Sequence, residues 1–194
     1  MADLASTESV GAEVTTLDQF LQSIEKRAYK MAVISVRDHH EALDIIQDSM
    51  IKLVTHYSKR PLNELKPLFY RILQNKITDW HRHQKLKNIL LFWQSDDKYE
   101  ENMDSTLDIA SASVNSIVSP LEDIEHSQLK KQVSEALGSL SLQQQQCFLL
   151  RSWEGFSVAQ TAEILGCSQG SIKTHYSRAM AKLKEVLEVD YDNS

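Results

Sequence analysis

Apolar residues recur every three or four positions through the first half of the chain, which predicts amphipathic helices and no alternating strands. Thr16 and Gln19 match the pattern of a helix capping box, so a first helix is expected from residue 17. Asp38 and Glu41 repeat the pattern and predict a second helix to about Tyr57. The expected buried face of this second helix consists of Leu43, Ile46, Met50, Leu53 and Tyr57.

The opposite face of the second helix combines charge with one large apolar side chain. Asp44, Gln47, Asp48 and Ile51 fall on this face, and all four are expected to be exposed. Charged faces are usually only solvated, whereas an exposed isoleucine among acids favours a protein-binding face. The residues alone leave both interpretations open.

A third helix is predicted from about Asn63 or Pro67 to Leu86. Its expected buried side consists of Phe69, Ile72, Leu73, Ile77 and Trp80. The other side carries a polar stripe, Arg71, Asn75, Asp79 and Arg82, continued by His83, Lys85 and Lys87. Such a stripe is either a row of intrahelical polar pairs or a DNA-facing surface, where Asn and Arg can read base edges and Lys and Arg neutralise phosphates. Trp80 is expected to pack in the core rather than to stack on a base.

Residues 157–178 read as two short helices joined by a tight turn, which predicts a helix-turn-helix. Ser157 with Gln160 would cap the first helix, Gly166 would end it, and Ser168 would cap the second. The small side chain of Ala162 would let the two helices approach closely. The second helix is expected to bury Ile172, Tyr176, Ala179, Met180, Leu183 and Leu187. Its opposite face, which would point into solvent or a DNA major groove, holds Lys173, Thr174, Ser177 and Arg178.

These patterns divide the chain into two small helical domains, residues 16–93 and residues 121–189. In the second domain, helices ending near Gly138 and Gly155 precede the helix-turn-helix. Residues 94–120 are acidic and rich in Ser, Asp and Asn, so we expect a flexible tether that holds the domains apart. Residues 1–15 and 190–194 are expected to be disordered tails. The apolar run Ile89–Trp93 either closes the first core or docks on a partner.

The net charge of −6 hides an uneven distribution. Residues 61–93 hold six basic and two acidic residues, whereas residues 94–125 hold nine acidic residues and one lysine. Residues 171–184 hold four basic residues and no acid. Because acids oppose the phosphate attraction that dominates affinity for DNA, the chain should bind free DNA weakly. Something else must therefore bring it to DNA.

Few residues suggest redox, metal or membrane chemistry. Cys147 and Cys167 lack disulfide or metal-ligand spacing, so both are expected to be buried apolar residues in a reducing cytoplasm. The histidines at 39–40 and 81–83 come without convergent carboxylates or cysteines, so no metal or other cofactor is expected and an enzyme is the least expected function. No signal peptide is evident, and the longest apolar run, residues 89–93, is far too short to cross a bilayer.

Three stretches together resemble the sigma-70 family of bacterial RNA polymerase sigma factors, and more closely its extracytoplasmic-function group, group IV. Residues 44–48, Asp-Ile-Ile-Gln-Asp, resemble region 2.2, which grips the coiled coil of the polymerase β′ clamp. Residues 71–82 contain the N-x-x-x-D-x-x-R core of regions 2.3 and 2.4, which face the promoter −10 element and help to hold its melted strand. Residues 155–179 resemble region 4.2, which meets the −35 element.

The resemblance implies three sets of functional residues. Contacts with core polymerase would come from Asp44, Gln47, Asp48 and Ile51. Contacts with the −10 element would come from Arg71, Asn75, Lys76, Asp79, Arg82, His83 and Lys85. Contacts with the −35 element would come from Ser168, Ser171, Lys173, Thr174, Ser177 and Arg178.

The implied protein is all-α, with a region 2 helical bundle and a region 4 helix-turn-helix domain joined by a flexible linker. Its implied partners are core RNA polymerase (through the β′ clamp coiled coil and the β flap), promoter DNA and an anti-sigma factor. It would act in the cytoplasm without inserting into a membrane. The sequence departs from the family pattern where His81 and His83 interrupt the basic run and where Lys173 replaces a common arginine, so the promoter sequence stays open.

Two other functions fit parts of the sequence. Residues 171–175, Ser-Ile-Lys-Thr-His, also resemble the recognition helix of LuxR-type transcription regulators. Such regulators carry a first domain with strand–helix alternation, and residues 17–93 show only helical periodicity. An anti-sigma or adaptor protein that mimics sigma surfaces is the other alternative, but it would not need both a basic −10 stripe and a complete recognition helix.

Overall fold

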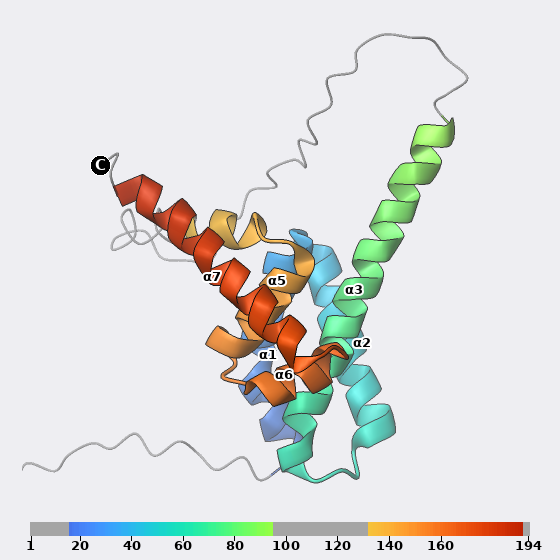
Figure 1. Cartoon of the computed structure of the whole chain (residues 1–194). Coiled ribbons are helices and arrows are strands. Elements are labelled where there is room, and N and C mark those ends of the chain that lie inside the picture. Colours follow the sequence, from blue (N-terminus) through green and yellow to red (C-terminus); the bar gives the residue numbers. More distant parts are fainter. Residues whose placement is uncertain (1–15, 95–131, 192–194) are drawn as a thin grey trace, which may run out of the picture.

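The computed structural model of the chain describes residues 16–94 and 132–191, and these ranges contain helices and no strand. The first domain consists of α1 (Leu17–Val36), α2 (His39–Tyr57) and α3 (Leu62–Gln94). The second consists of helical residues 132–138, α5 (Leu142–Phe148), a π-helical turn η1 (Leu149–Trp153), α6 (Val158–Leu165) and α7 (Gln169–Tyr191) (Figure 1). The all-α prediction is confirmed. The predicted tail 1–15, residues 95–131 and residues 192–194 lie outside the described residues. The predicted linker and C-terminal tail each begin too early, because Gln94 belongs to α3 and Asp190 and Tyr191 belong to α7.

Side-chain caps fix most of the helix starts. Reciprocal capping boxes join Thr16 to Gln19, Ser141 to Gln144 and Ser157 to Gln160. The box predicted at Asp38 is only half present. Its carboxylate accepts hydrogen bonds from the backbone N–H groups of His40 and Glu41, at 2.8 and 3.0 Å. The Glu41 side chain instead accepts a hydrogen bond of 2.9 Å from the indole N–H of Trp80. This contact ties α2 to α3.

The first domain is a bundle of three helices with a continuous apolar interior. Its fully buried side chains include Ala28 and Met31 from α1, Leu53 from α2, and Phe69, Leu73 and Ile77 from α3. Helix α3 begins at Leu62, slightly before the predicted starts, and contains Pro67 in its second turn. It also continues past its predicted end at Leu86, and its C-terminal half projects away from the other helices (Figure 1). Ile89 and Leu90 are exposed on this projection, so these two residues do not close the core.

The second domain packs directly on the first. Helix α6 contacts α3 (Figure 1). Buried residues of both domains form one hydrophobic cluster. Leu137, Leu149, Leu150 and Phe156 join this cluster from the second domain. The expectation that a tether holds the domains apart is therefore wrong for this structure, because the two cores are continuous.

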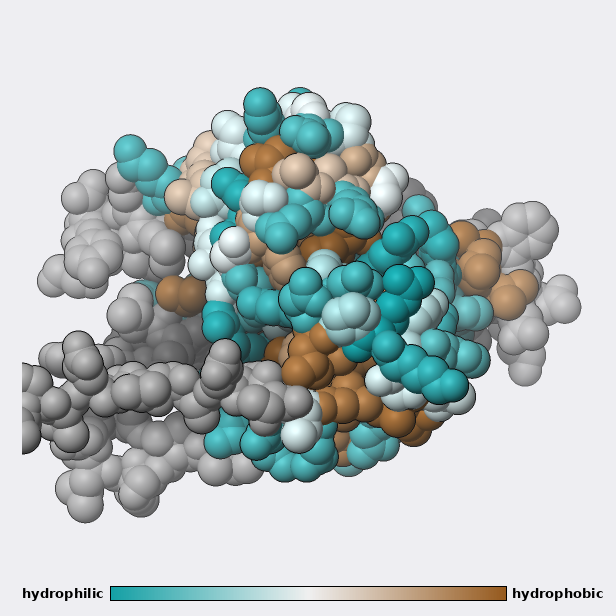
Figure 2. Space-filling model, turned by 90° about the horizontal axis from the view of Figure 1, so that it is seen from below, coloured by the Kyte–Doolittle hydropathy of each residue, from teal (hydrophilic) through white to brown (hydrophobic). Residues whose placement is uncertain are grey.

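Hydrophilic residues cover most of the surface seen from below, and hydrophobic residues reach it in a few groups between them (Figure 2). Over the described part of the chain, the large apolar side chains with the greatest exposure lie mainly on three helices. They are Leu43, Ile51 and Val54 on α2, Leu86, Ile89 and Leu90 on α3, Met180 on α7, and Val133. None of the helices in residues 16–94 and 132–191 is long and apolar enough to cross a bilayer.

Candidate polymerase-binding and nucleic-acid-binding surfaces

Helix α2 presents the face that the sequence predicts to be exposed. Asp44, Gln47 and Asp48 are exposed, and 63% of the Ile51 surface is open to solvent. The buried face, however, is rotated from the predicted one and consists of Ala42, Ile45, Ile46, Ser49 and Leu53. Leu43, predicted to be buried, is 45% exposed. It lies with Gln47, Ile51 and Val54 at positions i, i+4, i+8 and i+11, so α2 carries an exposed apolar ridge flanked by acids.

Two residues predicted for different partners contact each other. The ammonium of Lys76 on α3 lies 2.6 Å from a carboxylate oxygen of Asp48 on α2. Both side chains are partly exposed, so the pair adds at most about 1 kcal/mol to stability. The pair places the acidic edge of α2 beside the polar stripe of α3. A partner bound to α2 and DNA bound to α3 would therefore be neighbours at the Asp48–Lys76 ion pair.

The polar stripe of α3 is open to solvent along its length. Arg71, Asn75, Asp79 and Arg82 are all exposed, and His83 and Lys85 continue the stripe. One guanidinium nitrogen of Arg82 lies 3.2 Å from the Asp79 carboxylate, three residues earlier on the same helix. Exposed pairs of this kind are weak, so Arg82 can exchange the carboxylate for a phosphate at little cost.

Two aromatic residues beside the stripe face the protein instead. Trp80 is half-buried against the core, in agreement with the expected packing, and its indole N–H donates a hydrogen bond to the Glu41 carboxylate. His81 turns inward, with its Nε2 atom 2.9 Å from the backbone carbonyl of Ser35 on α1. Burial lowers the pKa of His81, although the Ser35 contact opposes the shift. The contact between His81 and Ser35 holds α3 to α1.

The helix-turn-helix forms as predicted. Gly166 ends α6 with a left-handed backbone, at φ 65°. The hydroxyl of Ser168 caps α7 by accepting a hydrogen bond of 3.0 Å from the backbone N–H of Ser171. Ala162 and Ile172 pack together with Cys147 in a small core of their own. Helices α6 and α7 therefore approach each other at Ala162, as its small side chain predicts.

The recognition surface of α7 is exposed, but its buried stripe differs from the predicted one. Exposed residues are Ser168, Lys173, Thr174, Ser177 and Arg178, and Ser171 is half-buried. Ile172, Ala179 and Leu183 are buried as expected, whereas Met180 is 44% exposed. Cys167, also predicted to be buried, is exposed and free, while Cys147 is buried. Burial raises the pKa of the Cys147 thiol to about 12.

Replacing Gly166 with alanine should lower the free energy of unfolding by about 1 kcal/mol, because a side chain disfavours the left-handed backbone. An added Cβ atom would meet nothing within 4 Å, so no clash adds to this cost. Gly170→Ala is the matched control, because Gly170 lies in α7 without a positive φ. This substitution should raise the free energy of unfolding by up to about 1 kcal/mol. Urea denaturation of the full chain gives both values. Equal shifts of the same sign in the two variants would contradict this explanation.

Sequence reasoning missed a cluster of charged residues between the domains. Glu154, directly after η1, is buried and contacts Arg27 of α1 and Lys66 of α3. Only the isolated acid between Trp153 and Gly155 could have drawn attention to it in the sequence. Within the part of the chain that the structure describes, no three His, Cys, Asp or Glu side chains gather as metal ligands would.

Both domains match models of known protein families. Residues 17–87 match sigma-70 region 2, and residues 130–183 match sigma-70 region 4. The chain belongs to the sigma-70 family. It is an alternative sigma factor, and relatives named as extracytoplasmic-function sigma factors place it in that group. The region 2 match decides against a LuxR-type regulator, which shares only the helix-turn-helix.

Individual relatives of this sigma factor match nearly its whole length. The RNA polymerase sigma-E factor of Streptomyces avermitilis is 24% identical over 177 residues, which cover 91% of this chain and 87% of the relative. The extracytoplasmic-function sigma factor SigM of Bacillus subtilis is 21% identical, over 87% of this chain and 93% of SigM. Among solved structures, the sigma factor RpoE of Bartonella quintana, in complex with the anti-sigma factor NepR, matches with a TM-score of 0.63 and 26% identity. That match covers 89% of this chain and 97% of RpoE.

Proposed function

We propose that this sigma factor binds core RNA polymerase through α2, the −10 element through the stripe of α3, and the −35 element through α7. The observation that carries the proposal is the exposed ridge of α2, where Ile51 is 63% open to solvent on the same face as Asp44 and Asp48. Leu43 and Val54 are also exposed on this ridge, and neighbouring apolar side chains rimmed by polar ones mark protein-interaction sites. The coiled coil of the β′ clamp is the partner that the family resemblance implies.

The two DNA contacts follow from the exposed polar residues of α3 and α7. On α3, Asn75 can hydrogen-bond a base edge while Arg71, Arg82 and Lys85 neutralise phosphates. On α7, Lys173, Thr174, Ser177 and Arg178 face outward from the recognition helix, the geometry by which a helix-turn-helix enters the major groove. Region 4 would also contact the β flap of the polymerase. The protein would act in the cytoplasm, where polymerase and promoters are, and would carry no enzymatic activity of its own.

An anti-sigma factor is a further proposed partner. The solved relative RpoE is bound to the anti-sigma factor NepR, and the match covers both domains of this chain. A protein that covers surfaces of both domains would keep the sigma factor from core polymerase. The proposal names the class of partner and not its sequence.

Reconstitution with core RNA polymerase tests the function directly. The purified chain should form a complex with core enzyme and direct transcription from a subset of a promoter library, whereas free chain should bind the same DNA weakly because of its net charge of −6. A complex that never initiates would instead indicate an adaptor that mimics sigma surfaces. The proposal would be overturned if the chain formed no complex with core enzyme and directed no transcription.

Asn75→Ala should slow the opening of the −10 element about fivefold, the effect of losing one base contact worth about 1 kcal/mol. Asn75 is exposed, so the fold should not change. Asn88→Ala is the matched control, because Asn88 is exposed on the same helix beyond the stripe. Stopped-flow fluorescence of a base analogue within the −10 element measures the rate. Equal rates for the two variants would remove Asn75 from the proposed contact.

A further inference from the structure

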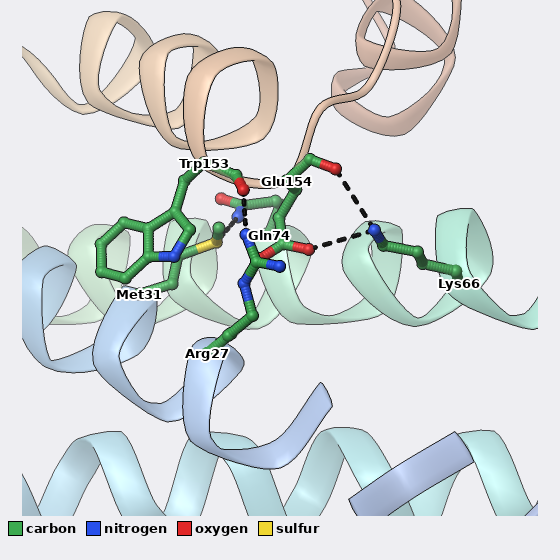
Figure 3. Close-up of polar contacts among 6 residues, drawn as sticks. All are labelled: Arg27, Met31, Lys66, Gln74, Trp153 and Glu154. Atoms are coloured by element: carbon green, nitrogen blue, oxygen red, sulfur yellow. Dashed lines mark hydrogen bonds and ion pairs between the residues drawn. The ribbon is translucent and has the colours of Figure 1, made fainter. Parts of the chain in front are cut away.

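Glu154 is a buried acid whose side chain forms ion pairs across the boundary between the domains. Only 2% of its side chain is exposed. One carboxylate oxygen lies 3.0 Å from Nε of Arg27, and the other lies 3.3 Å from Nζ of Lys66 (Figure 3). The same two cations bind backbone carbonyls of the second domain. Arg27 donates to the carbonyl of Trp153, and Lys66 donates to the carbonyl of Glu154 itself, at 3.2 Å (Figure 3).

The buried position of Glu154 in the second domain depends on two cations of the first domain, Arg27 and Lys66. A buried carboxylate without a partner is strongly disfavoured, so Glu154 can stay in this position only while Arg27 and Lys66 face it. When the domains separate, water can solvate all three groups. Arg27 and Lys66 are already 48% and 40% exposed, so they lose little by opening. The cluster therefore favours the closed arrangement without making it permanent.

The surrounding interface mixes apolar and polar groups. The ring of Phe156 meets that of Tyr70 edge-on at 5.4 Å, and Nζ of Lys66 lies 5.2 Å from the Phe156 centroid. Gln146 donates a hydrogen bond of 3.1 Å to the hydroxyl of Thr78. The Tyr70 hydroxyl is buried beside Glu154, and burial first, then the charge of Glu154 and a hydrogen bond with it, raise the pKa of Tyr70. The interface therefore combines part of the continuous apolar core with polar groups that water can solvate when the domains separate.

In this closed arrangement, with α6 packed on α3, the two DNA-binding surfaces lie too close together to reach both promoter elements. The −10 and −35 elements are centred roughly 25 base pairs apart, which is about 85 Å along B-DNA. Helix α6 packs on α3, and α7 starts four residues after Leu165, at Gln169. Four residues span at most about 15 Å, so the recognition helix begins close to the helix that carries the −10 stripe. One closed molecule cannot reach both elements at once.

The closed arrangement nevertheless leaves each surface open. Ile51 on α2, Asn75 on α3 and Arg178 on α7 are all exposed. Core polymerase can therefore bind α2 first, and only the simultaneous use of both DNA surfaces is blocked. We propose that Glu154, held between Arg27 and Lys66, is a latch that keeps the free sigma factor closed, and that its release is a required step between polymerase binding and use of a two-element promoter. This inference rests on the proposed function for its consequence in transcription, but the latch itself can be measured in the free chain.

The test uses small-angle X-ray scattering of the full free chain. Glu154→Lys turns the two attractions into repulsions, so the radius of gyration should increase. Glu25→Lys is the control, because Glu25 is exposed on α1 and the change in charge is the same. Lys66→Glu combined with Glu154→Lys restores an ion pair of reversed polarity and should return the chain toward the wild-type radius. Arg27→Ala combined with Lys66→Ala should also open the chain, because it removes both cations that face Glu154. Both side chains are about half-exposed, so the fold of each domain should be kept, and circular dichroism checks the helix content.

Transcription provides the second measurement. With limiting core polymerase, Glu154→Lys should initiate severalfold faster than wild type on a promoter with both elements, and equally fast on one with only a −10 element. A wild-type radius in both Glu154→Lys and the double alanine variant would overturn the latch. Opening without faster initiation would overturn its role as a required step. If wild type does not initiate with core polymerase at all, the proposed function fails, and the scattering result stands separately.

Discussion

Replacing Ile51 with glutamate should weaken binding to core RNA polymerase by about thirtyfold or more. Apolar residues at the centre of protein interfaces commonly contribute about 2 kcal/mol or more, which corresponds to this factor. The new carboxylate would also lie beside Asp44 and Asp48, where it must lose water to reach the partner. Fluorescence anisotropy of labelled sigma factor titrated with core enzyme, without DNA, measures the affinity.

Leu86→Glu is the matched control for this substitution. Leu86 is 57% exposed, close to the 63% of Ile51, and lies on α3 away from the α2 ridge. Both variants should unfold at the wild-type temperature, because neither side chain belongs to the core. If the two glutamates weaken core binding equally, a general effect of negative charge explains the loss. If Ile51→Glu binds like wild type, the α2 ridge is not the polymerase contact.

The sequence predicts best what depends on neighbours along the chain. Capping at Thr16 and Ser157 and the left-handed turn at Gly166 each involve groups within four residues, and all three are confirmed. The exposed stripe of α3 is confirmed for the same reason, since residues at i, i+4 and i+8 share a face of any straight helix.

Burial within a helix is harder to predict, because it depends on where the other helices lie. On α2, the small residues Ala42 and Ser49 are fully buried, while Leu43 is half-exposed. The close approach of helices selects small side chains, whereas sequence reasoning favours large apolar ones. Met180 and Cys167 differ from the prediction for the same reason, since each is apolar in character but lies outside the surface that the neighbouring helices cover.

The contact between the domains could not be predicted. Lys66 precedes Glu154 by 88 residues, and no periodic pattern connects positions so far apart. The acidic segment between the domains suggested separation, because its composition disfavours folding. The composition of the joining segment does not decide whether the domains touch, and the apolar residues Phe156 and Tyr70 favour contact. Contact between the domains therefore depends on residues that are distant in the sequence, which no local pattern reveals.

Replacing Lys173 and Arg178 together with alanine should reduce initiation from a promoter with a good −35 element by about a hundredfold. Each contact to a base or phosphate is worth about 1–3 kcal/mol, and two of them together approach this factor. Both side chains are exposed on α7, so the loss comes from DNA contacts and not from the fold. The slope of log affinity against log salt for the polymerase holoenzyme should also become shallower by about 2 if both cations neutralise phosphates.

Two controls separate a specific contact from a general loss of charge. Lys26→Ala with Lys30→Ala removes the same charge from exposed positions on α1 and should change initiation little. A promoter with a scrambled −35 element should be used equally by wild type and the α7 variant, because the contact has no target there. If the α7 variant loses as much on the scrambled promoter as on the intact one, Lys173 and Arg178 do not read the −35 element. Their role would then be to attract DNA of any sequence, as expected for phosphate contacts alone.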